Sequence, residues 1–267
     1  MTYLLLICIA ENVQLTSEQS AAMGPATESW VDETDRRGVR REGSGLRPVR
    51  EATTVRVRDG GVLVSDGPFA ETKEQIAGYD VIESPSLDEA IEVAARHPVA
   101  RFGAVEVRRF DSGGWWRSPD RSEGPEYLMI HCLDEDAELS PADDCDVPGS
   151  PAALEQQAWD AETYASGLKL AGGRLQPAST ARTVRVRDGE MLVTDGPFAE
   201  TKEQVAGFNV LTCPSLAEAV EIASRHPTAR IGTFDCARSR RDRSTLPAAR
   251  SLQSDSRTPA RLPPVTT

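Results

Sequence analysis

Ten consecutive residues, Asp66–Gln75, occur a second time in this chain without a single substitution, as Asp195–Gln204. The two copies begin 129 residues apart, a spacing that far exceeds a solenoid repeat and approaches the size of a small domain. Aligned at this spacing, residues 54–103 and 183–232 are identical at 35 of 50 positions. The sequence therefore predicts a tandem duplication of one domain.

The duplication divides the chain into four parts. We expect domains at residues 1–110 and 126–236, a linker at residues 111–125, and a basic, disordered tail at residues 237–267. The linker is rich in Gly, Ser and Pro, and the tail is dominated by Arg, Ser, Pro and Thr, which is typical of disorder. With 267 residues and 39% apolar content, the chain can bury two modest cores, which fits two domains better than one.

Charge, hydropathy and cysteine spacing exclude several classes of protein. The formal net charge is −12, whereas nucleic-acid binding needs clustered Lys and Arg, so we expect no nucleic acid on the folded part. There is no apolar run of membrane-spanning length, and the first residues lack the basic leader of a signal peptide. The five cysteines form no Cys-x-x-Cys pair, which disfavours a disulfide framework. We expect a cytoplasmic protein that does not enter a membrane.

The order of elements predicted for each copy is strand, helix, hairpin, strand, helix, strand. In the first copy these elements cover residues 3–9, 17–37, 54–64, 77–82, 86–97 and 103–110. Asp59-Gly60 between alternating apolar runs is a strong hairpin signal, and Ser86 with Glu89 forms a capping box. This order predicts an α+β fold made of two tandem ferredoxin-like βαββαβ domains, each with an inserted hairpin.

Residue periodicity also predicts which side chains face inward. Arg108 and Arg109 follow the apolar part of the last strand and are expected to point outward. The second copy's first helix begins at Ser150-Pro151. The four side chains expected to form its apolar face are Leu154, Ala158, Ala161 and Ala165. In the linker, Trp115 and Trp116 are expected to cover apolar surface or to seal the domains together, with ligand contact as the alternative.

The repeated segment carries a family resemblance. Asp-Gly-Pro-Phe-Ala-Glu-Thr-Lys-Glu, preceded by Thr-Val-Arg-Val-Arg-Asp-Gly and followed by a Ser-Leu-x-Glu-Ala helix, resembles the YCII-related family in its DGPF-containing branch. The resemblance covers residues 3–110 and 127–236. It implies a dimeric α/β-barrel fold, in which two ferredoxin-like units pack sheet to sheet. Here both units lie on one polypeptide, so the resemblance implies an internal pseudo-dimer.

The same resemblance implies a range of functions. Relatives include muconolactone isomerases and cofactor-free monooxygenases, whose active sites lie in a cleft between sheet and helices. A catalytic His and Asp pair has been proposed for YCII-like proteins, but no His lies in residues 17–37 or 150–167, and His97-Pro98 and His226-Pro227 replace the Asp-Pro step. The frequent association of this branch with extracytoplasmic-function sigma factors implies an accessory or regulatory role.

Four residues at strand and helix ends are candidates for catalysis: Asp66, His97, Asp195 and His226. An Asp at the open end of a strand, beside a Lys, can act as a base, and His titrates in the useful range. The alternatives are structural. Asp-Gly-Pro is also a turn former, and a cationic His at a helix end complements the helix dipole.

Six residues are candidates for ligand binding: Asp66, Lys73, Tyr79, Asp195, Lys202 and Phe208. A cleft lined by such side chains would favour an enzyme or a small-molecule-binding protein. The alternative for Glu71, Lys73 and Glu74 is a solvated turn. Phe69 and Phe198 are expected to be core anchors.

Three functional hypotheses follow. The first is small-molecule binding, or a cofactor-free activity of the isomerase or lyase type, in clefts of each domain. The second is a non-enzymatic accessory partner of an extracytoplasmic-function sigma factor, and the third is a structural dimer module. Three His and no closely spaced His or Cys pair predict no metal site, and the lack of a Gly-rich phosphate loop predicts no nucleotide cofactor.

Overall fold

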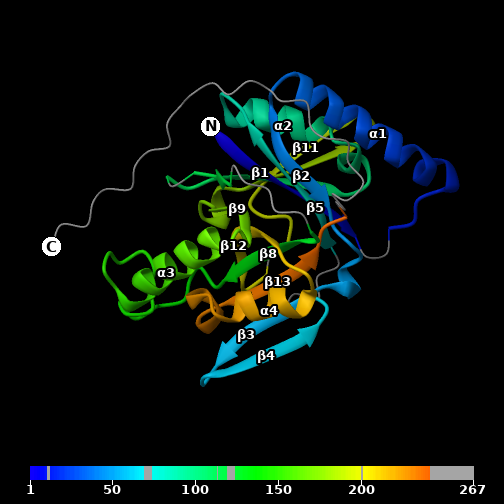
Figure 1. The fold of residues 1–267 in the computed structure, drawn as a ribbon. Helices are drawn as coiled ribbons and strands as arrows, with labels where there is room; N and C mark the ends of the chain where they lie inside the picture. The colour runs from blue at the N-terminus through cyan, green and yellow to red at the C-terminus, as the bar shows by residue number, and fades with distance from the viewer. Residues whose placement is uncertain (11–12, 69–73, 113, 119–123, 200, 241–267) are drawn as a thin grey trace.

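Two antiparallel β-sheets form the centre of the molecule, and helices lie on the outside of both (Figure 1). The computed structural model describes residues 1–10, 13–68, 74–112, 114–118, 124–199 and 201–240. The tail was predicted to begin at residue 237, but Ala237 and Arg238 end the last strand, and residues 241–267 lie outside the described residues. The mixed α+β class predicted from the sequence is confirmed by the two sheets and by the four α-helices in the described chain.

Each half of the chain supplies a corresponding series of elements. The first half contains β1 (Thr2–Ala10), α1 (Ser17–Arg36), β2 (Arg40–Gly45), β3 (Thr53–Arg58), β4 (Gly61–Asp66), β5 (Glu74–Glu83), α2 (Leu87–Arg96) and β6 (Ala104–Arg109). The short strand β7 (Trp116–Arg117) follows. The second half contains β8 (Glu126–Leu133), α3 (Pro151–Ala165), β9 (Lys169–Arg174), β10 (Arg182–Arg187), β11 (Glu190–Asp195), β12 (Gln204–Thr212), α4 (Leu216–Ser224) and β13 (Thr233–Arg238).

The two halves exchange their hairpins. The first sheet has the order β11-β10-β6-β1-β5-β2, and the second has the order β4-β3-β13-β8-β12-β9-β7. The hairpin β3–β4 of the first half thus extends the sheet of the second half, where Val55 pairs with Phe234. The hairpin β10–β11 extends the first sheet, where Val184 pairs with Val105. Figure 1 shows β3 and β4 beside β13 and α4.

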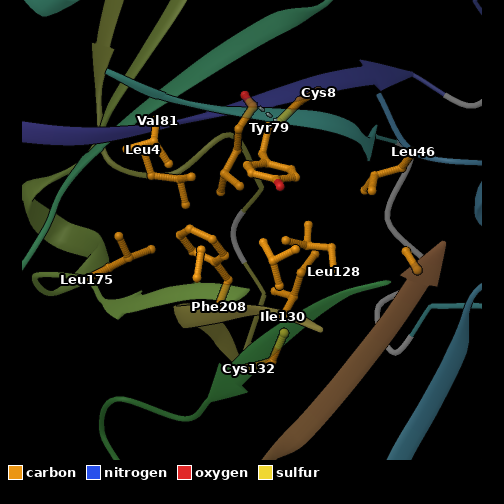
Figure 2. Close-up of a cluster of buried hydrophobic side chains, with 14 of the residues drawn as sticks. Leu4, Cys8, Leu46, Tyr79, Val81, Leu128, Ile130, Cys132, Leu175 and Phe208 are labelled. Carbon is orange, nitrogen blue, oxygen red and sulfur yellow. Dashed lines mark hydrogen bonds between the residues drawn. The ribbon is translucent and has the colours of Figure 1, made fainter. Parts of the chain in front are cut away.

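Three apolar clusters hold these layers together. The cluster between the sheets combines side chains of β1 and β5 with side chains of β8 and β12, as Figure 2 shows. A second cluster joins the first sheet to α1 and α2, and a third joins the second sheet to α3 and α4. Cys8 and Cys132 are buried in the cluster between the sheets, as the small apolar residues expected there.

Local signals in the sequence are confirmed where the backbone demands particular residues. Asp59 and Gly60 both have positive φ, 52° and 75°, as a tight two-residue hairpin turn requires. Ser86 caps α2 by accepting a hydrogen bond from the backbone N–H of Glu89. Helix α1 runs through Pro25 without ending.

Besides β7 in the expected linker, two strands were missed by the sequence prediction. β2 and β9 follow the first helix of each half and pair with β5 and β12. Their sequences, Arg-Arg-Glu-Gly-Ser-Gly and Lys-Leu-Ala-Gly-Gly-Arg, lack the β-branched and aromatic residues that favour strands. The glycines are needed for close approach, because a Cβ on Gly43 or Gly172 would clash with Asp80 or Asn209 on the neighbouring strand.

The predicted apolar face of α3 is wrong. All four expected residues are exposed, and Leu154 alone has 56% of its surface in solvent. The buried residues are Ala152, Ala153, Trp159 and Thr163. Trp159 explains why the buried face of α3 differs from the predicted one. Its large ring is buried against the outer face of the second sheet and sets the rotation of the helix.

The tryptophans of the linker cover apolar surface, as expected. Trp115 packs against the cluster between the sheets. Trp116 lies in β7, which pairs with β9, and its ring contacts Tyr164 of α3 at a centroid distance of 5.0 Å. The linker therefore adds a strand to the second sheet. Among the described helices, none is long and apolar enough to cross a membrane.

Candidate functional site: a cavity between the two sheets

A cavity of about 80 Å³ lies between the sheets, and both halves of the chain contribute to its wall. Much of the wall is apolar, with Leu46 and Ala52 from the first half and Ile130, Phe198 and Ala237 from the second. Among the described residues of the wall, the charged ones are Arg47, Glu106, Glu203 and Asp235. An apolar cavity with a few converging polar groups is the usual form of a small-molecule site.

Glu106 is the most deeply buried of these carboxylates, with 1% of its surface exposed. Arg108 donates a hydrogen bond to Oε1 at 3.1 Å, and the backbone N–H of Phe198 donates to Oε2 at 2.9 Å. Burial raises the pKa of the Glu106 carboxyl, and the nearby Arg108 opposes this rise. The carboxyl therefore holds the repeated segment of the second half in place and has an increased affinity for a proton.

Asp235 occupies the position in β13 that Glu106 occupies in β6. Thr54 lies opposite Asp235 in the sheet, as Thr183 lies opposite Glu106. The Thr54 hydroxyl donates to Asp235 Oδ1 at 2.9 Å. Each carboxylate thus faces the hairpin that the other half has contributed.

Glu203, the last acidic residue on the wall, is close to an arginine and a threonine. Its Oε2 accepts a hydrogen bond from the Thr233 hydroxyl at 2.6 Å, and its Oε1 lies 4.0 Å from an Arg56 nitrogen. In the part of the wall that the structure describes, three carboxylates and one arginine therefore face the cavity, which gives this part a negative balance of charge.

Arg108 lies inside the molecule, contrary to the prediction that it points outward. Its side chain is completely buried. Besides binding Glu106, it donates to the carbonyl oxygen of Gln176 at 2.6 Å and lies 3.9 Å from Glu135. Alternation along β6 explains this orientation, because Arg108 is on the same side of the strand as Glu106, whereas Arg109 is exposed as predicted.

The two repeated aspartates lie at exposed ends of strands. Asp66 ends β4 and Asp195 ends β11, and neither is among the described residues of the cavity wall. The glycines that follow them, Gly67 and Gly196, have φ values of 82° and 87°. This backbone supports the turn-forming role, while ligand binding by the aspartates stays a prediction.

The other predicted ligand-binding residues are dispersed. Lys73 lies outside the described residues, and Lys202 is exposed, 3.5 Å from Asp134. Tyr79 and Phe208 are buried between the sheets, with ring centroids 5.6 Å apart, and point toward each other in Figure 2. Their rings join the two halves of the core.

His97 and His226 are buried and act as caps. The Nδ1 of each ring accepts a hydrogen bond from a backbone N–H two residues later, at 3.2 Å. Each ring also packs edge-on against a tryptophan, Trp30 or Trp159. Burial lowers the pKa of His97 to about 4 and that of His226 to about 3. Both are therefore neutral near pH 7, and they cap the following 3₁₀ turn instead of complementing a helix dipole as cations.

Glu106, Arg108 and Asp235 were not identified from the sequence as site residues. One signal was available, because residues 106 and 235 are acidic at matching positions and each lies between two apolar residues. Which face of the strand they occupy was ambiguous, since both faces of β6 are buried.

Comparison with known proteins identifies a family whose model matches most of the chain. The family model described as YCII-related domain matches residues 1–111 and again residues 128–238. An uncharacterized protein of Rhizobium meliloti (strain 1021) is 54% identical over 50 residues, which is 19% of this chain. The match spans 40% of that relative's length.

Proposed function

Because the chain belongs to the YCII-related family, with two copies of its domain, we propose that it binds a small molecule in the cavity between the sheets. The observation that carries this proposal is the convergence of Glu106, Glu203 and Asp235 on an otherwise largely apolar cavity. Carboxylates placed in such a cavity orient a ligand and can exchange protons with it.

A cofactor-free activity of the isomerase or lyase type fits this wall. Glu106 is the residue proposed to move the proton, because burial raises its pKa toward the range in which a carboxyl both accepts and donates protons. The hydrogen bonds from Arg108 and Phe198 hold its two oxygens in fixed positions. Each oxygen keeps a further lone pair for a ligand.

A fragment screen tests the binding proposal. Fragments that enter the cavity should raise the melting temperature of the wild-type protein but not that of Ala237→Leu, which fills the cavity. Ala158→Leu is the matched control, because it adds the same atoms on the exposed face of α3. Equal shifts in both variants, or no shift with any fragment, would contradict the proposal.

Hydrogen exchange tests the proton-transfer step. A bound fragment with an acidic C–H bond should take up deuterium from D₂O faster in the presence of the protein, measured by mass spectrometry. Glu106→Gln should remove this acceleration while fragment binding persists. Unchanged exchange in Glu106→Gln would rule out Glu106 as the proton acceptor.

The arrangement of strands supports a more specific description of the fold. Within the first half the order is β6-β1-β5-β2, and with the two helices on one face this is the order proposed for a ferredoxin-like unit. Two such units packed through their sheets correspond to the dimeric α/β-barrel arrangement, with the pseudo-dimer on one chain. The repeated Asp-Gly-Pro-Phe motif supports assignment to the DGPF-containing branch.

A second candidate function is an accessory role in protein binding. The edge strands β4 and β11 expose Val62, Leu63, Val64, Met191, Leu192 and Val193. An apolar strand at a sheet edge can pair with an extended segment of another protein. If a sigma factor of the extracytoplasmic-function class is the partner, Leu63→Lys with Leu192→Lys should abolish co-purification of the two proteins, and Ala237→Leu should not.

A further inference from the structure

The two halves place corresponding groups around two corresponding regions between the sheets. Gln176 donates its backbone N–H to the carbonyl oxygen of Arg109, and Arg47 donates its own to the carbonyl oxygen of Arg238. Glu106 contacts the first region through Arg108 and also lines the cavity, and Asp235, its counterpart, faces the second region. The backbone frame is therefore the same on both sides.

The contents of the two regions differ. On the first side, the completely buried guanidinium of Arg108 binds Glu106 at 3.1 Å and the Gln176 carbonyl oxygen at 2.6 Å. On the second side, the position of Arg108 is taken by Ala237, and Ala237, Arg47 and Asp235 line the cavity. A protein cation thus fills one region, and the corresponding region is open.

We propose that the open cavity binds a small alkylguanidinium or alkylammonium cation, in the way that the first side binds the side chain of Arg108. Asp235 and the carbonyl oxygen of Arg47 would bind the N–H groups, as Glu106 and Gln176 do on the first side. This proposal rests on the proposed function and specifies its ligand class. The proposal gives the molecule one such site, because the side chain of Arg108 already fills the first region.

The walls of the cavity match such a ligand in charge and in shape. Among the described residues of the wall, Glu106, Glu203 and Asp235 face one arginine, Arg47, so the local potential favours a cation. Leu46 and Ile130 provide apolar surface for the alkyl part. A guanidinium or ammonium group forms short, strong hydrogen bonds with a carboxylate in such surroundings.

Three small probes of similar size test the ligand class: ethylguanidinium, the neutral N-ethylurea and the anion butyrate. We expect ethylguanidinium to bind wild-type protein with a stoichiometry of one in calorimetry, and to occupy the cavity in soaked crystals. Asp235→Asn should weaken binding by about tenfold or more, the effect of losing a charge-assisted hydrogen bond. Glu138→Gln, which removes an exposed carboxylate that is not among the described residues of the wall, is the charge-matched control.

Exchanging the two residues that distinguish the halves provides the decisive variants. Ala237→Arg should fill the cavity and abolish ethylguanidinium binding. Arg108→Ala should open the first region, so that the stoichiometry rises to two and ethylguanidinium raises its melting temperature more than N-ethylurea does. If Arg108→Ala fails to fold, Ala237→Arg and Asp235→Asn still decide the question.

The outcomes also separate this inference from the proposed function. If neutral or anionic fragments occupy the cavity and ethylguanidinium does not, the cation proposal is wrong while a small-molecule site remains. Undiminished ethylguanidinium binding by Ala237→Arg would overturn the proposed location. If no probe or fragment binds, both proposals are wrong.

Discussion

The packing of helix against helix is nearly the same in the two halves, whereas the buried polar groups differ. On the outside, Trp30 donates its indole N–H to the carbonyl oxygen of Val93 at 3.2 Å, and Trp159 donates to that of Ile222 at 3.0 Å. These corresponding contacts anchor helix to helix in both halves. Retention of the same packing after duplication indicates that the outer layers maintain the fold.

Buried polar groups instead differ at corresponding positions, on both faces of the sheets. On the helix-facing side, Asp80 forms a buried ion pair with Arg40 at 2.6 Å, whereas its counterpart Asn209 forms a hydrogen bond with His131 at 2.7 Å. Between the sheets, Arg108 and Ala237 differ at corresponding positions. The same backbone therefore accepts several polar arrangements, and the difference between Arg108 and Ala237, which reaches the cavity, is where the halves are expected to differ in function.

The largest expected effect comes from placing the second half's residue in the first half. Asp80→Asn leaves Arg40, whose side chain is 8% exposed, without its buried carboxylate, which should cost about 3–5 kcal/mol. Urea unfolding measures this loss. Adding Arg40→Met should recover much of it, and a cost below about 1 kcal/mol for Asp80→Asn would show that the ion pair contributes little.

Acid should destabilise both halves through their buried histidines. The folded-state pKa values of about 4 for His97 and about 3 for His226 lie below the unfolded value, near 6.5. Each neutral ring thus contributes stability that is present above pH ~6.5 and is lost as the pH falls toward the folded pKa, on the order of 3 kcal/mol for each.

Unfolding measured between pH 7 and pH 4 checks this dependence. His97→Asn keeps a side-chain acceptor at the cap and removes the titrating group, so its stability should fall less steeply with acid. The same slope for wild type and variant would mean that the pKa of His97 is the same in the folded and the unfolded protein.

A smaller difference is expected between the two threonines of the exchanged hairpins. The Thr54 hydroxyl contacts both the Gly67 carbonyl oxygen and Asp235, whereas for Thr183 the corresponding bond is to the Gly196 carbonyl oxygen. Thr54→Val should therefore cost about 2 kcal/mol and Thr183→Val about 1 kcal/mol. Thermal unfolding of the two variants compares them, and a larger loss for Thr183→Val would reverse the asymmetry.

The smallest effect is expected on the exposed face of α3. Because the Leu154 side chain is largely in solvent, Leu154→Ala should change stability by no more than about 0.5 kcal/mol. Ile91→Ala on the buried face of α2 should cost about 2 kcal/mol or more. Similar losses for the two variants would show that α3 contacts another surface in solution.

Local features of the fold could be predicted because they depend on neighbouring residues. Asp59-Gly60 specifies a hairpin turn whichever sheet the hairpin joins, and Ser86 caps its helix whichever element packs on that helix. By contrast, no local sequence signal indicates which sheet a hairpin extends, so the exchange of hairpins between the halves was not predicted. Whether an edge strand forms at Gly43 depends on space beside another strand, which is a property of the assembled sheet.

The candidate site was harder to predict for the same reason. Repetition directed attention to Asp66 and Asp195, which turn the chain at the surface. The cavity wall instead depends on Glu106 and Asp235, which come from strands with both faces buried, where alternation does not distinguish the inner face from the outer. Arg108 is expected at the surface from the sequence alone, because arginine is rarely buried unless it is paired, and its partners are known only from the structure.

The exchange of hairpins also affects how the protein can be made in a cell. Thr54 and Asp235, which meet in the second sheet, are 181 positions apart. At typical translation rates, β3 would wait roughly 10–40 s for its partner strand to be synthesised. During that interval the apolar residues of the hairpin have no sheet to join, so the nascent first half is a natural substrate for chaperones that shield strand edges until the second half emerges.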